Sequence, residues 1–412
     1  MRIIPDLTAP LLNLRIILIR NRIPLLFISA AILLSAASVI TGFAVTGIMT
    51  AVEKPPETAP AALPQLVVYP ARWHGGSRAA CSITFDDGTM DQYLLGAEEL
   101  EKRDIRGTFF VITDLMDNGV WKDGETRRKL FSWDQARDLE MRGHEIASHT
   151  AEHLDLQANP GKAEKQIEKA YTTLSRELYP GKHFTLSWPY WRVSREALEY
   201  AAFYHFAARA GRAGGAGSTA GAEYFYEENS KTPRDYMQIS SRGIMPSGTP
   251  ASLLPVIENA YQKGGWFIPN FHGIKDSRIP LYYTGWEALE LEAFTEILDI
   301  LSGYDFWFAP FGDAAKYARQ RDALQLDVSS NPKNPESLTV RYSGGLDPEV
   351  YNSPITLVLV PSHGFSITAV KNIRCKMLLK MYEKESASFS GYYVEIPPGD
   401  GELLVVFEMS GR

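Results

Sequence analysis

Hydrophobic and polar positions alternate in blocks along most of this chain. Short runs rich in β-branched and aromatic residues lie at Ala80–Phe85, Gly107–Ile112, His144–Ser148, Phe184–Trp188, Tyr236–Ile244, Trp266–Phe271 and Phe306–Ala309. Helical stretches separate them, at Gln92–Lys102, Trp133–Met141, Ala163–Leu178, Ala251–Lys263 and Trp286–Leu301. Strands that alternate with helices predict an α/β fold, with βα units around a parallel sheet or barrel over residues 67–322.

The pattern changes in the last part of the chain. Strand-like runs now follow one another without a helix, separated by Pro, Gly, Asn and Ser, at Leu324–Ser329, Ser337–Tyr342, Ile355–Val360, Ile373–Tyr382, Tyr392–Ile396 and Glu402–Glu408. Such a run of short strands is typical of an antiparallel fold. We therefore predict a small, sandwich-like antiparallel β-domain over residues 323–412.

The N-terminus carries an apolar segment. Residues 23–52 contain no charged side chain, and about 20 apolar residues suffice to cross a bilayer. Four arginines lie within residues 1–22, whereas acidic residues follow the segment, so the positive-inside rule predicts a cytoplasmic tail, a transmembrane helix at 23–52 and an exported remainder. A cleaved signal peptide, processed near Ser35–Ser38, is the alternative, which would give a secreted protein.

Two further segments are predicted to lack regular structure. Residues 53–66 are rich in proline and are typical of a semi-rigid linker between membrane and domain. The stretch Ala210–Ala222 is rich in glycine and alanine and indicates a flexible loop. It is either a surface insertion or a mobile lip over a site.

Composition narrows the class of protein. An apolar fraction of 45% and a charged fraction of 22% in 412 residues are those of a globular chain. The net charge of -7, with no basic cluster in the exported part, argues against nucleic acid as a partner. The two cysteines, Cys81 and Cys375, are far apart and predict neither a disulfide framework nor a zinc knuckle, so we expect two small buried hydrophobes.

Candidate chemistry begins at Thr84-Phe-Asp86-Asp87-Gly88, which ends a strand-like run. The C-terminal ends of barrel strands are where active sites are built. Two adjacent carboxylates disfavour double ionisation, and a bound cation would resolve this for one of them and leave the other as a base. A solvated Asp-Asp-Gly turn is the alternative for the dipeptide alone.

Histidines follow two other strand-like runs. His149 and His153 come after the run that ends at Ser148, and their spacing would place both imidazoles on one face of a helical turn. Two neutral histidines and one carboxylate make a ligand set for a divalent ion with open positions. His272 ends the run Trp266–Phe271 and would face the same end of the barrel, where it could act as an acid.

These motifs, TFDDG, then HTAEH after GHEI, then a strand ending in FHG, resemble the polysaccharide deacetylases of carbohydrate esterase family 4. The resemblance covers roughly residues 67–317 and implies a distorted (β/α) barrel. It also implies a divalent ion, most often zinc, held by Asp87, His149 and His153. Asp86 would be the general base toward water, His272 the general acid, and the backbone N–H of Tyr190 would stabilise the oxyanion.

The chain departs from the family pattern in two places. The motif Arg-x-Pro-Tyr is here Ser187-Trp-Pro-Tyr190, so the arginine beside the catalytic base is missing, and Arg192 or Arg209 could take its place. No aspartate that would tune the acid histidine stands near Ile239–Arg242. We interpret this as a divergent active enzyme rather than a degenerate one.

Other polar and aromatic residues near the motifs are expected to be structural or peripheral. His144 and Glu145 lie within the strand before the metal pair and are expected to support it. Tyr282–Trp286 follows the acid histidine and is the best candidate for a platform on which sugars stack, whereas Trp188, Trp191 and Trp266 taken singly are expected in core or rim packing.

The function that these residues predict is metal-dependent hydrolysis of N-acetyl or O-acetyl groups on a cell-surface or extracellular polysaccharide, by a membrane-anchored protein with its catalytic domain outside the cytoplasm. Hydrolysis of another non-peptide C–N bond, such as a cyclic amide, is the first alternative. A non-catalytic glycan-binding protein that works through its β-domain is the second.

Overall fold

The computed structural model describes residues 65–123, 126–178, 184–211, 233, 235–331, 334–372, 380–383 and 390–409. Residues 61–412 form one compact unit. The expected tail, transmembrane segment and linker up to residue 64, and most of the 210–222 loop, lie outside the described residues. Within the described part, no helix is both long and apolar enough to cross a bilayer. The N-terminal anchor therefore stays a prediction.

Parallel strands build the core of the first domain. The eight-stranded sheet runs in the order β10-β9-β8-β7-β4-β3-β13-β11. Its strands are β3 (Thr84–Phe85), β4 (Thr108–Val111), β7 (Glu145–Ser148), β8 (Phe184–Ser187), β9 (His205–Ala210), β10 (Ile239–Ser240), β11 (Arg242–Gly243) and β13 (Pro269–Phe271). The two strands at opposite ends of this order, β10 and β11, are consecutive in the chain, and they pair with β9 and β13, so the sheet nearly closes into a barrel. This confirms the distorted (β/α) barrel.

A second, smaller sheet extends the barrel on the side of the strand N-termini. It pairs β2 (Ala79–Cys81) with β12 (Trp266–Phe267) and with β16 (Phe306–Phe308), all in parallel. β2 leads into β3, and β12 leads into β13, so each pair is one broken strand. Because of the break, β2 pairs with β16, whereas β3 pairs with β4. This change of partner along one strand distorts the barrel.

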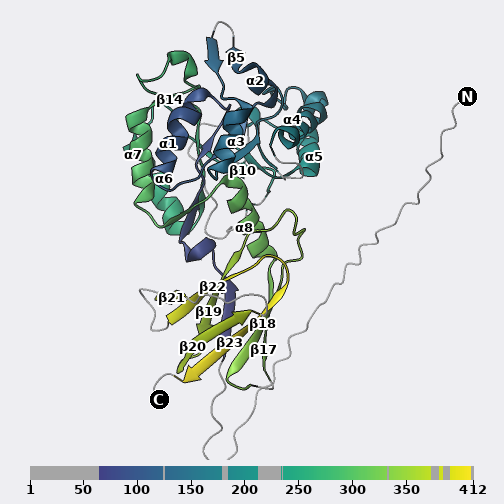
Figure 1. The fold of residues 1–412 in the computed structure, drawn as a ribbon, viewed down its shortest axis with the longest axis vertical. Helices are drawn as coiled ribbons and strands as arrows, with labels where there is room; N and C mark the ends of the chain where they lie inside the picture. The colour runs from purple at the N-terminus through teal and green to yellow at the C-terminus, as the bar shows by residue number, and fades with distance from the viewer. Residues whose placement is uncertain are drawn as a thin grey trace, which may run out of the picture. The chain divides into compact units, whose positions relative to one another are not determined.

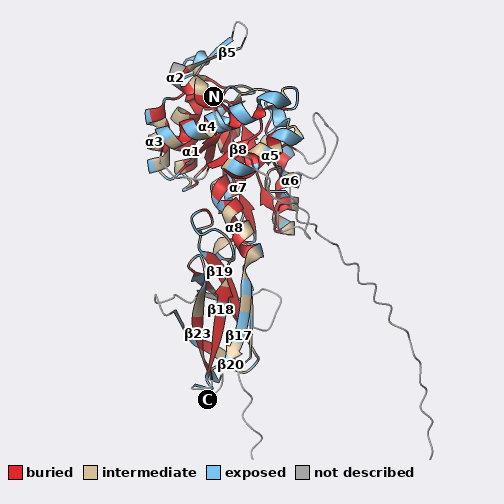
Figure 2. Ribbon diagram, turned by 90° about the vertical axis from the view of Figure 1, so that its right-hand side faces the viewer, coloured by how far each residue is buried: buried red, intermediate tan, exposed pale blue. Residues whose placement is uncertain are grey.

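Helices surround the strands, with α6 and α7 on one side and α4 and α5 on the other (Figure 1). They are α1 (Ala97–Glu101), α2 (Thr113–Asn118), α3 (Trp133–Met141), α4 (Ala163–Glu177), α5 (Arg195–Tyr204), α6 (Pro250–Lys263), α7 (Leu291–Ser302) and α8 (Phe311–Ala323). α3 begins where the sequence predicts, because Ser132 and Gln135 form a reciprocal capping box that satisfies two free N–H groups. Buried positions gather in the strands and exposed ones on the outer helix faces (Figure 2).

The barrel differs from the expectation in one missed strand and one helix start. β9 was not predicted, because His205–Ala210 is rich in alanine and lacks the β-branched residues that indicate a strand. The predicted helix Trp286–Leu301 begins only at Leu291, since Leu289–Glu290 form β15, which pairs with β14 (Ile274–Lys275). This pairing holds the 282–290 segment beside the strand end that carries His272.

The C-terminal domain consists of two four-stranded antiparallel sheets, β1-β19-β22-β21 and β17-β18-β23-β20. The strands are β1 (Leu66–Pro70), β17 (Gln325–Ser330), β18 (Ser337–Ser343), β19 (Ile355–Pro361), β20 (Phe365–Asn372), β21 (Lys380–Glu383), β22 (Ser390–Ile396) and β23 (Gly401–Met409). The predicted strand Ile373–Tyr382 falls largely on residues 373–379, which lie outside the described part; its last residues belong to β21, and β20 ends before it, at Asn372.

The first strand that the structure describes, β1, belongs to this C-terminal domain. β1 pairs with β19 in antiparallel register, from Leu66 opposite Pro361 to Pro70 opposite Leu357. Residues 67–70, which the sequence places in the barrel domain, are therefore a strand of the β-domain. The reason is their strict alternation of half-buried and exposed positions, which suits the edge of an antiparallel sheet rather than a barrel strand buried on both faces.

One apolar cluster joins the barrel to the β-domain. It includes Trp73 and Tyr317 of the first domain and Leu357 and Val394 of the second, all buried. Tyr317 of α8 also donates its hydroxyl to the carbonyl of Ala71 at 3.1 Å. A shared core of this kind ties the stability of one domain to the other.

Candidate active site

Both aspartates of the TFDDG motif lie directly after β3 at the C-terminal end of the barrel. Asp86 and Asp87 are 3% and 2% exposed. The backbone of Asp87 is left-handed, with φ of 79°, as is that of Gly88, with φ of 74°. A non-glycine residue in this region is strained, and such strain is concentrated at functional sites. The two carboxylates have different partners: Asp86 pairs with Arg209, whereas Asp87 faces His153.

His149 and His153 meet Asp87, but not on a helical turn. The segment after β7 is a loop in which Thr150 and His153 both have positive φ, 67° and 58°. The predicted helical turn is therefore wrong, and the two rings come together, with centroids 4.7 Å apart, because the loop folds back. His149 Nδ1 lies 2.8 Å from the carbonyl oxygen of Ser187, which leaves its Nε2 toward Asp87.

One atom from each of Asp87, His149 and His153 lies within 4.8 Å of the other two. Asp87 Oδ1 is 3.7 Å from His149 Nε2 and 3.6 Å from His153 Nε2. It is buried and has no hydrogen-bond partner among the described residues. An orphaned carboxylate oxygen facing two ring nitrogens is the arrangement that a divalent ion would complete.

The protonation states of these side chains also fit a metal ion. Burial, and then the neighbouring Asp86 charge, raise the pKa of Asp87 well above its ordinary value. Burial lowers the pKa of His149 to about 4. Burial, with the nearby His149, lowers the pKa of His153 to about 2. The imidazoles are therefore neutral and available as ligands. At Asp87 the positive charges of Arg128 and Arg209 do not offset the effect of burial on the pKa, so a further cation would stabilise the ionised form.

Asp86 has a cation beside it, and this cation is Arg209. Burial alone would raise the pKa of Asp86, but Arg209, with smaller contributions from His149 and His272, holds it well below its usual range. Arg209 Nη2 donates to both carboxylate oxygens at 2.5 Å, and Asn270 Nδ2 donates to Oδ2 at 3.1 Å. Asp86 is thus kept ionised and fixed in orientation.

Arg209 replaces the missing family arginine from the neighbouring strand. β8 and β9 pair Ser187 directly with Arg209, and Arg209 Nη2 also donates to the Ser187 hydroxyl at 2.5 Å. Its other terminal nitrogen donates to Ser241 at 2.7 Å. Arg192, the other candidate, pairs instead with Asp155 at 2.9 Å and is half exposed. Of the two arginines, it is therefore Arg209 that serves Asp86.

His272 follows β13 and faces Asp86, with Nε2 3.9 Å from Asp86 Oδ2. Burial lowers the pKa of His272, against the opposing effect of Asp86 and Glu287. Glu287 Oε2 lies 3.5 Å from His272 Nδ1, on the side away from Asp86. Sequence reasoning missed Glu287, because no aspartate stands at the expected place and a glutamate after the aromatic group carried no signal of its own.

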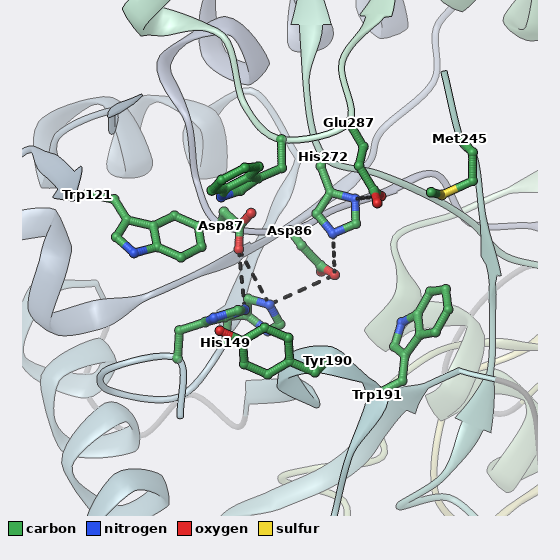
Figure 3. A pocket seen from close by; sticks show the side chains of 11 residues that line it. Asp86, Asp87, Trp121, His149, Tyr190, Trp191, Met245, His272 and Glu287 are labelled. Carbon is green, nitrogen blue, oxygen red and sulfur yellow. Dashed lines mark ion pairs between the residues drawn. The ribbon is translucent and has the colours of Figure 1, made fainter. Parts of the chain in front are cut away.

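These residues line one pocket of about 430 Å³. Asp86, Asp87 and His272 lie at its centre, with Trp121 on one side and Trp191 and Met245 on the other (Figure 3). Tyr190 also lines it, with a left-handed backbone, φ of 55°, and its ring 4.6 Å from that of His153. The pocket therefore brings together every residue that the sequence singled out for chemistry. Trp121, Met245 and Glu287 were not anticipated.

The neighbouring residues have the supporting roles expected of them. Glu145 accepts hydrogen bonds from Thr108, Thr185 and Gly312, and His144 accepts one from the N–H of Gly107. Trp188 and Trp266 are buried in the core. Of the predicted sugar platform, Trp286 lines the pocket and Tyr282 stands half exposed beside it. Cys81 is buried and free, as expected, whereas Cys375 lies outside the described residues.

Residues 75–208 match the family model described as polysaccharide deacetylase. The chain contains a polysaccharide deacetylase domain. The family that this domain matches, carbohydrate esterase family 4, is one of hydrolases that act on carbon–nitrogen bonds of acetylated sugars. The match ends at Ala208, so it covers the strands followed by the two aspartates and by His149 and His153, but not the strand followed by His272.

Other known proteins resemble the deacetylase domain in part. A gellan lyase of a Bacillus species is 22% identical over 298 residues, which are 70% of this chain but 11% of that protein. A de-N-acetylase structure from Aggregatibacter actinomycetemcomitans is 20% identical, with a TM-score of 0.29, over 33% of this chain and 66% of the other. A Streptococcus pyogenes deacetylase in complex with acetate is 20% identical, with a TM-score of 0.33, over 42% and 69%. The family match, and not these partial likenesses, identifies the domain.

Proposed function

We propose that this protein is a metal-dependent deacetylase that removes N-acetyl or O-acetyl groups from a cell-surface or extracellular polysaccharide. The observation that carries the proposal is the convergence of Asp87, His149 and His153 within 4.8 Å, next to an Asp86 that Arg209 keeps ionised. Zinc is the ion that this set of two histidines and one carboxylate suits best. When bound, such an ion lowers the pKa of a water ligand and polarises the acetyl carbonyl.

The protein's own residues supply the proton transfers. Asp86 is ionised and within the pocket, so it can accept the proton of the attacking water. His272, with Nε2 3.9 Å from Asp86 Oδ2, can donate a proton to the departing amine, which could not leave as a free anion. Tyr190 lines the pocket with a left-handed backbone, and we assign its N–H to the stabilisation of the developing oxyanion.

The test is acetate release by the full chain from acetylated oligosaccharides, with and without a chelator. We expect release that depends on the metal and falls at least about a hundredfold in Asp86→Asn, the usual loss for a general base. Release that survives chelation, or full activity in Asp86→Asn, would contradict the mechanism. Binding of sugar by residues 323–412 with no turnover of any substrate would favour the non-catalytic alternative.

The second candidate, hydrolysis of a small cyclic amide, needs an enclosed pocket. The pocket here adjoins another hollow across Trp121, which supports an extended substrate instead. Turnover of cyclic amides but not of acetylated glycans would reverse this preference.

We also propose that the domain acts outside the cytoplasm, anchored by residues 23–52. The support is the uncharged run and the arginines before it. In intact cells, externally added protease should remove the deacetylase domain from a membrane-bound fragment; protection of the domain would contradict the topology.

A further inference from the structure

A second hollow of about 1000 Å³ lies beside the catalytic pocket. Its lining includes Trp121, Lys122, Arg127, Glu152 and Tyr282. Trp121 lines both spaces, so the two hollows meet at this side chain. In the close view of the catalytic pocket, Trp121 stands at the edge opposite Trp191 (Figure 3). A polymer lying in the pocket would therefore continue past Trp121 into the second hollow.

The second hollow carries two cations that face each other. β5 (Val120–Asp123) and β6 (Thr126–Lys129) form a hairpin in which Lys122 is paired with Arg127. Like charges directly opposite one another destabilise a strand pair. Among the residues that the structure describes, neither cation takes part in an ion pair. On a chain with a net charge of -7, this is a local positive site that an anion would stabilise.

Glu152 is the acidic group in the lining of this hollow. Its Oε2 accepts a hydrogen bond from Gln166 Nε2 at 2.8 Å, and its backbone N–H donates to Gln166 Oε1 at 2.9 Å. Glu152 is therefore held against α4 by the Gln166 side chain. One carboxylate against Lys122 and Arg127 leaves the hollow with a positive balance.

The hairpin is fixed to the catalytic pocket through its other face. Arg128, paired with Trp121 across the hairpin, donates to the carbonyls of Thr284 and Gly285 at 2.7 and 3.0 Å. Its guanidinium lies 4.0 Å from the centre of the Trp286 ring. Lys122 and Arg127 follow and precede this clamped pair along the two strands, so the clamp also fixes the two cations in the lining of the second hollow.

Aromatic rings complete the surface. Tyr282 is 50% exposed. Trp121 lies edge-on to His153, with centroids 5.1 Å apart, so a ring that stacked on Trp121 would be next to the metal ligands. Aromatic faces bind the apolar faces of sugars, and guanidinium and ammonium groups bind carboxylate or phosphate. An aromatic surface with two cations suits an acidic sugar.

We propose that this hollow is a subsite for a negatively charged sugar, so that the substrate is an acidic glycan whose anionic residue neighbours the acetylated one. The anion is a carboxylate or a phosphate, which Arg127 and Lys122 would bind. This inference rests on the proposed deacetylase function and adds the substrate class to it.

The experiment compares acetylated oligosaccharides of equal length on the metal-loaded full chain. The neutral substrate is a chitin oligosaccharide, the carboxylate substrate an N-acetylheparosan oligosaccharide, and a phosphate-bearing acetylated oligosaccharide distinguishes the two anions. In Lys122→Gln and in Arg127→Gln we expect the KM for the acidic substrate, divided by the KM for the neutral one, to rise roughly tenfold, while kcat stays nearly constant. The reason is that a charge-assisted contact is lost which binds the ground state and the transition state equally. The exposed cation Lys371 of the β-domain provides the control Lys371→Gln, which should leave the ratio unchanged.

A second measurement separates this inference from the proposed activity. Asp86→Asn is titrated with N-acetylheparosan oligosaccharide and with the neutral one, and binding is followed calorimetrically. Weaker binding of the acidic oligosaccharide after Arg127→Gln would uphold the subsite. This holds even if no acetate is released from any glycan, in which case the deacetylase proposal fails and the subsite stands. Equal binding of acidic and neutral sugars, or a KM ratio that does not move in either variant, would overturn the subsite while leaving deacetylation untouched.

Discussion

At the scale of single residues, the site shows how a chemical requirement is met from an unexpected position. Asp86 needs a cation to stay ionised in a buried pocket, and the position expected to supply it holds Ser187. The pairing of β8 with β9 puts Arg209 next to Ser187, so the same guanidinium reaches the same carboxylate from one strand further on. What Asp86 requires is a positive charge nearby, and the sequence position of the residue that carries this charge matters less.

Exchanging Ser187 and Arg209 tests the hypothesis that Asp86 requires a cation beside it, whichever of the two strands supplies it. Arg209→Ser should lower kcat/KM at least about a hundredfold. It should also shift the acidic limb of the pH–rate profile to higher pH, because the pKa of Asp86 rises when the cation is lost. Adding Ser187→Arg in the same chain should recover part of the loss.

Arg192→Ser is the matched control and should leave the rate unchanged. No recovery in the double variant, with a thermal midpoint near that of the wild type, would show that Arg209 serves another purpose than its charge.

His272 and Glu287 give the second prediction at this scale. The Glu287 carboxylate opposes the burial that lowers the pKa of His272. If His272 must be protonated to act as the acid, Glu287→Gln should move the alkaline limb of the pH–rate profile to lower pH. We expect roughly half a unit, since a partly exposed pair is worth at most about 1 kcal/mol. Glu290→Gln, which affects only the pair with Lys275, is the control; identical profiles for both variants would refute the role of Glu287.

At the scale of elements, the segment 282–290 matters most because it supplies Trp286 and Glu287 to the pocket. It docks against the strand end that carries His272 through the β14–β15 pairing and through a close approach of backbones. A Cβ on Gly285 would lie 2.6 Å from the carbonyl oxygen of His272. A glycine at this position is therefore required by packing.

Gly285→Ala should push the segment away from His272. We expect a loss of about 1–3 kcal/mol in the free energy of unfolding, the usual range for overpacking, together with a lower kcat. Urea unfolding and initial rates would measure both. Gly161→Ala is the control, since a Cβ there meets nothing within 4 Å. Unchanged stability and rate in Gly285→Ala would show that the segment adapts without loss.

At the scale of the whole molecule, stability should depend on pH through a buried histidine outside the site. Burial lowers the pKa of His205 in β9 to about 4. The unfolded chain binds a proton near pH 6.5, whereas the folded protein does not, so stability is complete above pH 6.5 and falls as the pH drops toward 4. The contribution amounts to about 3 kcal/mol over that window.

The difference between the wild type and His205→Leu isolates this contribution. The unfolding free energy of the variant, measured in urea from pH 7 to pH 4, should fall less steeply than that of the wild type. His363→Leu, which replaces an exposed histidine of the β-domain, should keep the wild-type slope. Equal slopes in all three proteins would mean that His205 is protonated in the folded state.

The sequence by itself determined the alternation of strands and helices, the β-rich C-terminal part and the residues of the site. These are local properties: periodicity, capping such as that of Ser132, and polar side chains at strand ends. It could not reveal β9, because alanine-rich strands owe their conformation to neighbours on both sides. The assignment of β1 to the β-domain likewise depends on a partner, β19, far along the chain.

Only the tertiary structure decided which charges meet. Arg209 reaches Asp86, and Glu287 reaches His272, through strand register and loop docking. The Lys122–Arg127 pair forms within one hairpin, but the contacts of Arg128 with the distant residues Thr284 and Gly285 place it beside the pocket. The left-handed turns at Asp87, Thr150 and His153 also arise there, since local preference opposes them and only the surrounding packing can hold them. Motifs identify the groups that can do chemistry, while register and packing set their charges and their neighbours.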